Sequence, residues 1–256
     1  MKDIRLIIWR LVVVALILGA WQGLSGPVFD SFWVSRPSAI AAWLWKSIVT
    51  GSLGADLLIT AKETVYGYLI GAVAGLALAF VLAQSERAAV VLRPFILAIY
   101  GIPRIALAPL FVLWFGIALA SKIMMAAMVT LLLVFFNTYE GIRSADLQLK
   151  SVALVLGASR WQLFWNVTLP NASPWMLAGL RIAIPQALVG AVVAEFIAST
   201  GGLGYLIMDT TSTLDSAGTM AGIIVLMLVV LLLGTLLDRI EGWLLRWRPQ
   251  EKSDKA

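Results

Sequence analysis

The stretch that decides the architecture of this chain runs from Ser151 to Pro170 and reads SVALVLGASRWQLFWNVTLP. It is polar compared with its surroundings, and the segments on either side are apolar enough to span a bilayer. Folding into lipid does not require a helix–Gly–helix insertion between two spans. Such an insertion is instead typical of a surface that is presented to a partner.

The composition is that of an integral membrane protein. Of 256 residues, 61% are apolar and 13% are charged, against about 45–50% and about 25% in soluble domains. The 11 Trp residues suit the aromatic belts of membrane interfaces. The chain has no Cys and no His, which excludes disulfides, thiolate nucleophiles, sulfur-ligated metals and the most common general base. The net charge of +5 is explained by membrane topology, and we expect no nucleic-acid partner.

Apolar runs predict about six transmembrane helices in an all-α protein. The predicted spans are Ile7–Leu24, Thr64–Leu82, Phe95–Phe115, Ile123–Tyr139, Pro174–Ala198 and Ala221–Leu237. The third is the least regular, because Gly101, Pro103 and Pro109 interrupt it. The first resembles the apolar part of a signal peptide, but Trp21 and Gln22 follow without a small-residue cleavage site, which favours an uncleaved span.

The distribution of Lys and Arg predicts the orientation of the chain. With both termini in the cytoplasm, 13 basic residues fall inside, 4 fall outside, and Arg104 and Arg181 lie near the inner boundary. The four outside are Arg36, Lys46, Lys62 and Lys122. This orientation places residues 144–171 in the cytoplasm, within a single transmembrane domain that covers 1–256.

The segment 26–59, on the outer side, is too polar to span. Residues 35–38 resemble a helix start, with Pro37 in the first turn. Four apolar residues then repeat at helical spacing, namely Ile40, Trp43, Leu44 and Ile48. We predict a short amphipathic helix on the outer surface, with a packing role.

The 144–171 loop is predicted to contain two helices. The first covers 146–156, and Gly157 interrupts it because glycine permits backbone angles that other residues resist. Ser159 can cap a second helix, which Pro170 ends. That helix is largely apolar, with Trp161, Leu163, Phe164 and Val167. Such a loop can tuck against its own bundle or dock in a groove on another protein, and physical reasoning alone leaves both open.

Two features of the predicted spans suggest contacts inside the membrane. Glu195, near the outer end of the fifth span, either faces a translocation path or gate, or snorkels to the outer surface. Gly67, Gly71 and Gly75 recur every four residues, a spacing that lets helix backbones approach closely. Packing within the chain is the preferred explanation of these glycines over a subunit interface.

The interrupted third segment suggests a cavity, because broken helices at membrane depth often line one. Arg104, expected on the cytoplasmic side of the break, either meets lipid headgroups or attracts an anion into a pathway. Residues 201–204, Gly-Gly-Leu-Gly, are expected to turn into a short outer helix. No G-x-x-x-x-G-K-[ST] sequence occurs in the chain, so it carries no ATP site of that kind.

Two groups of residues carry a resemblance to a known family. The run Ala153-x-x-Leu156-Gly157-Ala158-Ser159, with Phe164-x-x-Val167-x-Leu169-Pro170 and Gly179-Leu180-Arg181, resembles the EAA motif of permease subunits of bacterial ABC importers. Phe111-x-x-Trp114-Phe115-Gly116, Asn137-Thr138-x-x-Gly141-x-Arg143 and Gly202-Leu203-Gly204 are similar to permeases of the nitrate/sulfonate/taurine group.

The resemblance implies a type I ABC importer permease fold (MetI-like), with cytoplasmic coupling helices between the fourth and fifth spans. It implies a permease without a catalytic site of its own, paired with a second copy in the bacterial cytoplasmic (inner) membrane. ATP and Mg would be bound by separate ATPase subunits, and a secreted or periplasmic binding protein would deliver a small solute. The chain itself would bind no cofactor and no metal.

One departure from the motif concerns its usual Glu, which falls on Ser151 here. A Ser can hydrogen-bond but cannot form an ion pair, so we expect docking to depend more on Leu156, Trp161 and Phe164 than on charge. The full set expected at the ATPase contact is Ser151, Ala153, Leu156, Gly157, Ala158, Trp161, Phe164 and Pro170. The candidates for the solute pathway are Arg104, Pro109 and Glu195.

Two other classes of protein remain as alternatives. A secondary transporter would more often show inverted repeats and paired intramembrane charges, and neither is evident in the sequence. A membrane scaffold without transport leaves Glu195 and the broken third segment unexplained. Nothing in the sequence chooses between nitrate, an alkanesulfonate, taurine, a pyrimidine or an aromatic carboxylate as the solute.

Overall fold

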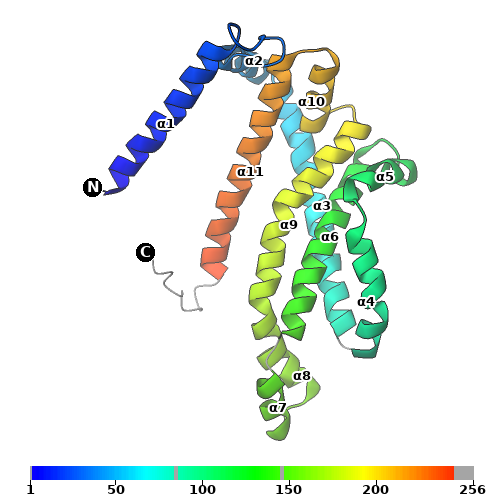
Figure 1. Cartoon of the computed structure of the whole chain (residues 1–256). Coiled ribbons are helices and arrows are strands. Elements are labelled where there is room, and N and C mark those ends of the chain that lie inside the picture. Colours follow the sequence, from blue (N-terminus) through cyan, green and yellow to red (C-terminus); the bar gives the residue numbers. More distant parts are fainter. Residues whose placement is uncertain (1, 84–85, 145–146, 245–256) are drawn as a thin grey trace.

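The computed structural model describes residues 2–83, 86–144 and 147–244, and these ranges form helices and no strand. Figure 1 shows an elongated bundle with α10 at one end and α7 and α8 at the other. The elements are α1 Lys2–Leu24, α2 Pro37–Val49, α3 Ser52–Ala83, α4 Glu86–Gly101, the 3₁₀-helix η1 Arg104–Leu107, α5 Ala108–Phe115, α6 Leu119–Arg143, α7 Leu147–Val155, α8 Arg160–Leu163, the π-helix η2 Phe164–Thr168, α9 Leu169–Ile197, α10 Leu203–Ser212 and α11 Ser216–Leu244.

The centre of the molecule is the packing of α3 and α9 on the two sides of α6. The predicted glycine stripe lies in this contact and allows the close approach of α3 to α6. A Cβ atom at Gly67 would meet Ala126, and one at Gly71 would meet the carbonyl oxygen of Ala127. The stripe therefore serves packing within the chain, which confirms the preferred explanation.

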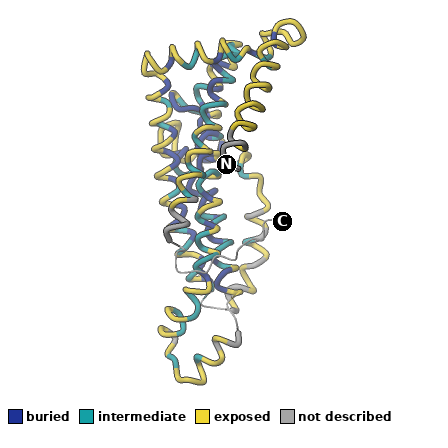
Figure 2. Tube along the Cα trace, turned by 90° about the vertical axis from the view of Figure 1, so that its left-hand side faces the viewer, coloured by how far each residue is buried: buried dark blue, intermediate teal, exposed yellow. Residues whose placement is uncertain are grey.

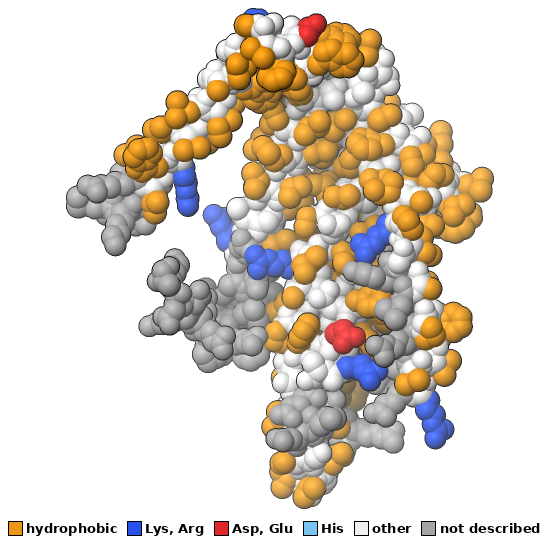
Figure 3. All heavy atoms as spheres, in the orientation of Figure 1, with side chains coloured by type: hydrophobic (Ala, Val, Ile, Leu, Met, Phe, Trp, Pro, Cys, Tyr) orange, Lys and Arg blue, Asp and Glu red, His pale blue; other side chains and the backbone are white. Residues whose placement is uncertain are grey.

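Four helical stretches among the described residues are long and apolar enough to cross a membrane: Ser52–Ala83, Leu119–Arg143, Trp161–Ile197 and Ser216–Leu237. Ile8–Leu24 and Arg104–Phe115 are apolar but shorter. Figure 3 shows apolar side chains over much of α1 and the upper part of the bundle. The structure thus defines four of the six predicted spans by length and composition.

The second predicted span begins too late. We predicted Thr64–Leu82, whereas α3 starts at Ser52, directly after Gly51 with φ +79°. The early part of α3 is polar along one face, but Thr60 and Glu63 are buried inside the bundle. Their polarity is therefore not a sign of a loop. Two lysines that were assigned to the outer loops also lie in helices: Lys62 in α3 and Lys122 in α6.

The third predicted span is not one helix. The run Phe95–Phe115 contains the end of α4, a break at Ile102 and Pro103, the 3₁₀-helix η1 and the short α5. Pro103 has no N–H to donate and restricts the residue before it, and Pro109 lies in the first turn of α5. The predicted break is therefore confirmed, and α5, which follows it, packs against α6 and α9.

The first two helices lie at the edge of the molecule. Figures 1 and 2 show α1 standing apart from the bundle, with exposed residues along its length. The predicted surface helix is confirmed as α2, which starts at Pro37 and buries Ile40. It packs on α11 and is fixed there by a hydrogen bond of 2.8 Å from Trp43 Nε1 to Asp215 Oδ2.

Candidate functional site: the protruding loop, a buried polar junction and a cavity

The loop between α6 and α9 projects beyond the bundle at the end opposite α10 (Figure 1). Its first helix, α7, ends in a Schellman motif: the Ala158 N–H donates to Ala153 O, and the Gly157 N–H donates to Leu154 O, each at 3.0 Å. Gly157 has φ +80°, a region that glycine enters without strain. This confirms the predicted turn.

The second helix of the loop begins with a reciprocal cap. The backbone N–H of Ser159 donates to Gln162 Oε1 at 2.8 Å, and the N–H of Gln162 donates to Ser159 Oγ at 3.3 Å. This is a capping box, with Gln in the place that Glu often takes. The cap predicted at Ser159 is confirmed, and it fixes the angle between the two loop helices.

The apolar residues of the loop divide between two surfaces. Val155 and Leu156 form the tip and are 87% and 81% exposed, and Trp161 is 69% exposed. Phe164 instead packs edge-on against Phe80 of α3, with ring centroids 5.5 Å apart. The loop therefore both tucks against its own bundle and presents an apolar tip. Phe164 belongs to the first contact, and its predicted part in docking stays a prediction.

Pro170 does not end the second loop helix, contrary to the prediction. The chain is helical without interruption from Trp161 to Ile197, a stretch of 37 residues. Before the proline, η2 shifts the pairing so that the Leu169 N–H donates to Phe164 O. This π-turn and the position of Pro170 in the first turn of α9 let the helix continue although proline donates no hydrogen bond. The loop is thus joined rigidly to α9.

The other residues expected at the docking contact lie on or beside α7. Ser151 and Leu156 are exposed, and Ala153 and Ala158 are half-buried where the Schellman motif closes. The structure brings Ser151, Leu156 and Trp161 onto one protruding unit. It separates Pro170, which lies at the base of that unit in α9.

Glu195 lies in a buried polar junction between α3, α9 and the start of α10. Its side chain is 1% exposed. It accepts a hydrogen bond of 2.7 Å from Thr60 Oγ1 and one of 2.5 Å from the Gly204 N–H. It therefore does not snorkel to the surface, and it does not line the cavity described below. It joins two helices to the Gly-rich turn, which leads into α10 as predicted.

The same junction is completed by polar residues of α3. Thr60 Oγ1 accepts from the Leu203 N–H at 2.8 Å, and Asp56 Oδ1 accepts from the Gly202 N–H at 2.9 Å. Gly202 has φ +106°, and a Cβ there would collide with the Glu195 carboxylate. The backbone N–H groups at the start of α10 are thus satisfied by side chains from two other helices.

Sequence reasoning missed two charged residues next to Glu195. Glu63 of α3 and Lys122 of α6 are each 1% exposed. The Glu63 carboxyl group lies within hydrogen-bonding reach of Glu195, and Lys122 interacts electrostatically with both acids. Lys122 Nζ also donates to the carbonyl oxygens of Ile117 and Ala118. No pattern in the sequence indicates that these charged residues from three helices lie together.

We predict that Glu195→Ala destabilises the protein strongly. The substitution leaves the Thr60 hydroxyl and the Gly204 N–H without an acceptor, at about 1–3 kcal/mol for each buried group. Thermal unfolding of the purified protein should show a melting temperature lower by several degrees. The control is Asp209→Asn, which changes an exposed acid on α10. Equal melting temperatures for the two variants would contradict the role of Glu195 as a junction residue.

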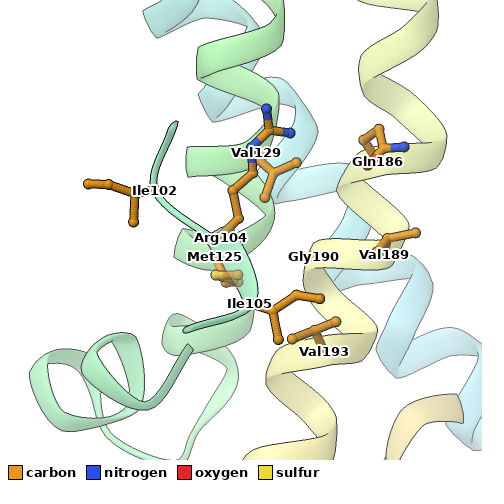
Figure 4. A pocket seen from close by; sticks show the side chains of 9 residues that line it. All are labelled: Ile102, Arg104, Ile105, Met125, Val129, Gln186, Val189, Gly190 and Val193. Atoms are coloured by element: carbon orange, nitrogen blue, oxygen red, sulfur yellow. The ribbon is translucent and has the colours of Figure 1, made fainter. Parts of the chain in front are cut away.

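A cavity of about 290 Å³ lies between the broken third segment, α6 and α9 (Figure 4). Arg104 and Ile105 line it from η1, Met125 and Val129 from α6, and Gln186, Val189 and Gly190 from α9. In Figure 4 the Arg104 side chain rises from the break alongside Val129, and Gln186 lies across the cavity on α9. Pro109 does not line the cavity, because it sits in the first turn of α5.

The position of the cavity corrects the depth assigned to Arg104. Met125 lies about 9 Å along α6 from its first residue, Leu119, and Gly190 lies about 10 Å along α9 from its last, Ile197. Both helix ends are on the α10 side of the bundle. Arg104 therefore lies beside the α10-side halves of α6 and α9, far from the loop end at which it was expected, because η1 folds back into the bundle.

The fold and these sites define a multi-pass membrane protein with a broken helix at membrane depth and a rigidly attached, apolar protruding loop. Residues 67–248 match the family described as binding-protein-dependent transport system inner membrane component. The chain belongs to this family, and it is a permease subunit of an ABC importer in the group that includes sulfonate, nitrate and taurine permeases.

Individual relatives agree with this assignment. The chain is 34% identical to a putative aliphatic sulfonates transport permease protein of Bacillus subtilis over 239 residues, which cover 93% of this chain and 87% of that one. It is 34% identical to a riboflavin transport system permease protein of Chloroflexus aurantiacus, covering 92% and 88%. It is 31% identical to a nitrate import permease protein of Synechococcus elongatus, covering 94% and 85%.

The fold is also that of a solved transporter chain. A chain in the crystal structure of an amino acid ABC transporter with histidines superposes with a TM-score of 0.65 at 20% identity, covering 77% of this chain and 96% of that chain. This likeness confirms the all-α permease fold.

Proposed function

We propose that two copies of this chain form the solute pathway of the importer and that separate ATPase subunits drive it through the protruding loop. The observation that carries the proposal is the exposed apolar tip at Val155 and Leu156. Apolar side chains on a short helix fit a hydrophobic groove of a partner. We propose that the partner on this side is an ABC ATPase and that the loop end of the bundle therefore lies in the cytoplasm.

The connections of the loop support a role in transmitting movement. Trp161 stacks on Phe164, and Phe164 packs on Phe80, so the loop bears on α3. The loop also continues into α9 as one helix, and α9 lines the cavity. A displacement of the tip by the ATPases would tilt α3 and α9 together. We propose that this tilt alternates access to the cavity between the two sides of the membrane, as a rigid-body transition.

The exposed surface of α1 supports pairing with a second copy. Leu11, Leu16 and Ile17 are 64%, 67% and 60% exposed. Among the described elements, α1 packs against α2 and stands away from the central helices. An apolar helix in this position must be covered by lipid or by another protein chain. We propose that the second copy covers part of it, with membrane lipid covering the rest.

We propose two further kinds of component for the transporter, ATPase subunits and a solute-binding protein. Its sequence has no P-loop, so we propose that ATP and Mg are bound by the ATPase subunits and that this chain catalyses no covalent step. A secreted or periplasmic binding protein would deliver the solute at the α10 end. The solute would be small, in the class of the nitrate and alkanesulfonates named for the relatives.

Co-expression with an ABC ATPase and a solute-binding protein of this transporter group tests the proposed function. We expect the chain to co-purify with the ATPase and to support ATP-dependent solute uptake in proteoliposomes. Failure of the chain to retain the ATPase would contradict the proposal.

The orientation has its own test, since the chain lacks Cys and single cysteines can be introduced. Thr213→Cys, which is exposed beyond α10, should react with a membrane-impermeant maleimide in intact cells. Leu156→Cys should react only after the membrane is opened. The reverse pattern would overturn the cytoplasmic placement of the loop.

A further inference from the structure

The cavity between η1, α6 and α9 has an unusual balance of polar groups. Its walls are mainly apolar, and the described residues that line it include one cation, Arg104, one amide, Gln186, and no acid. Two buried acids of the bundle, Glu63 and Glu195, lie in the separate junction with Thr60 and Gly204. Among the described side chains, a solute in the cavity therefore meets positive charge and hydrogen-bond donors and no acid.

We propose that Arg104 and Gln186 form an anion-recognising site, so that the transported solute carries a sulfonate, nitrate or similar oxyanion group. This inference rests on the proposed function, because it takes the cavity as part of the solute pathway. The guanidinium group presents donors in a planar fork that matches two oxygens of an oxyanion. The amide of Gln186 adds donors from the facing helix.

The residues around Arg104 strengthen the preference of the site for an oxyanion. Around Arg104 the walls are apolar, from Ile105 of η1 to Val129 and Val193 of the neighbouring helices. Arg104 is half-buried, and the apolar walls exclude part of the water around it, which strengthens its charge interactions relative to bulk water. Arg104 also has an interaction within the chain, but its guanidinium carries five N–H donors, so an anion can bind at the same time. A neutral solute gains little from this arrangement.

The size of the cavity sets a limit on the solute. About 290 Å³ is just below the range of roughly 300–1,000 Å³ that is typical of small-molecule pockets. A compact oxyanion such as nitrate or ethanesulfonate is small enough for this space in one chain. Because Gln186 and Gly190 lie on α9, which is continuous with the loop, movement of the loop would also change the distance between Gln186 and Arg104.

The test uses the complete transporter, with ATPase and binding protein, in cells that lack other uptake of the probes. Nitrate, ethanesulfonate and taurine serve as charged probes, and riboflavin and an uncharged pyrimidine as neutral ones. We expect ATP-dependent uptake of a charged probe. Arg104→Gln should lower its initial rate at least tenfold, and Gln186→Leu should lower it several-fold. Arg104→Lys, which keeps the charge but loses the planar fork, should give a rate between those of Arg104→Gln and the wild type.

Lys46→Gln is the matched control, because it removes one positive charge from an exposed position on α2. Its uptake and ATPase activity should equal those of the wild type. Co-purification with the ATPase shows whether each Arg104 variant is folded and assembled. Uptake of neutral probes only would overturn the inference, as would a wild-type rate in an assembled Arg104→Gln complex or no restoration by Arg104→Lys. Failure of the wild-type chain to assemble with the ATPase would instead contradict the proposed function.

Discussion

Gly71→Val is expected to deplete the folded protein almost completely. Gly71 lies where α3 approaches α6 most closely, and its missing side chain makes room for the Ala127 carbonyl oxygen and for Thr130, whose Cβ would lie 2.7 Å from the added atom. Backbone cannot move aside as a flexible side chain can. Overpacking a core costs about 1–3 kcal/mol where side chains can adjust, and we expect a larger cost here.

The measurement is the yield of monodisperse protein in detergent, together with its melting temperature. The matched control is Gly54→Val, which places the same side chain in the same helix at a position with nothing within 4 Å. This control also accounts for the intrinsic helix preference of valine. If both variants gave the same yield and melting temperature, the α3–α6 contact would not be the central packing element of the bundle.

The fold could be predicted from the sequence wherever hydrophobicity and small residues point to the same answer. The spans that became α6, α9 and α11 are long apolar runs, and the spacing of Gly67, Gly71 and Gly75 indicated a helix contact. The start of α3 could not be predicted in the same way. Thr60 and Glu63 are buried by contacts with distant segments, and hydropathy has no means to separate such residues from a polar loop.

The loop was predictable in its local chemistry and not in its long-range connections. Gly157 and Ser159 act through backbone geometry and capping within a few residues, so the sequence indicates both. The contact of Phe164 with Phe80 joins residues from different helices, and no local pattern indicates it. The continuation of the helix through Pro170 depends on the π-turn that precedes it, which sequence periodicity does not signal.

The buried charges show that an acid can be found in a predicted span from the sequence, but its hydrogen-bond partners cannot. Glu195 stands out in an apolar run, but its partners Thr60 and Gly204 come from α3 and from the turn before α10. Lys122 was counted as an outer charge because it precedes a predicted span by one residue. It is buried, and its Nζ donates to the carbonyl oxygens of Ile117 and Ala118 just before α6, where the chain turns at Gly116, with φ +78°.

Loss of the apolar tip is expected to separate the chain from its ATPase. Leu156→Asp places a charge at a position that is 81% exposed, so folding of the permease should be unaffected. In a hydrophobic groove, however, the same charge is buried without a partner, which is strongly unfavourable. We expect co-purification with the ATPase to fall at least tenfold and ATP-dependent uptake to be lost. Trp161→Ala should weaken the complex less, because part of that ring stacks on Phe164 of its own chain.

Ser151→Ala is the control for the nature of the contact. It removes a hydroxyl group from the position at which the EAA motif usually has Glu, and we expect the complex to survive because docking depends on the apolar tip. The melting temperature of each variant without the ATPase separates docking from folding. Retention of the complex in Leu156→Asp together with its complete loss in Ser151→Ala would reverse this assignment. Polar contacts along α7, rather than the apolar tip, would then carry the force from ATP hydrolysis into α9.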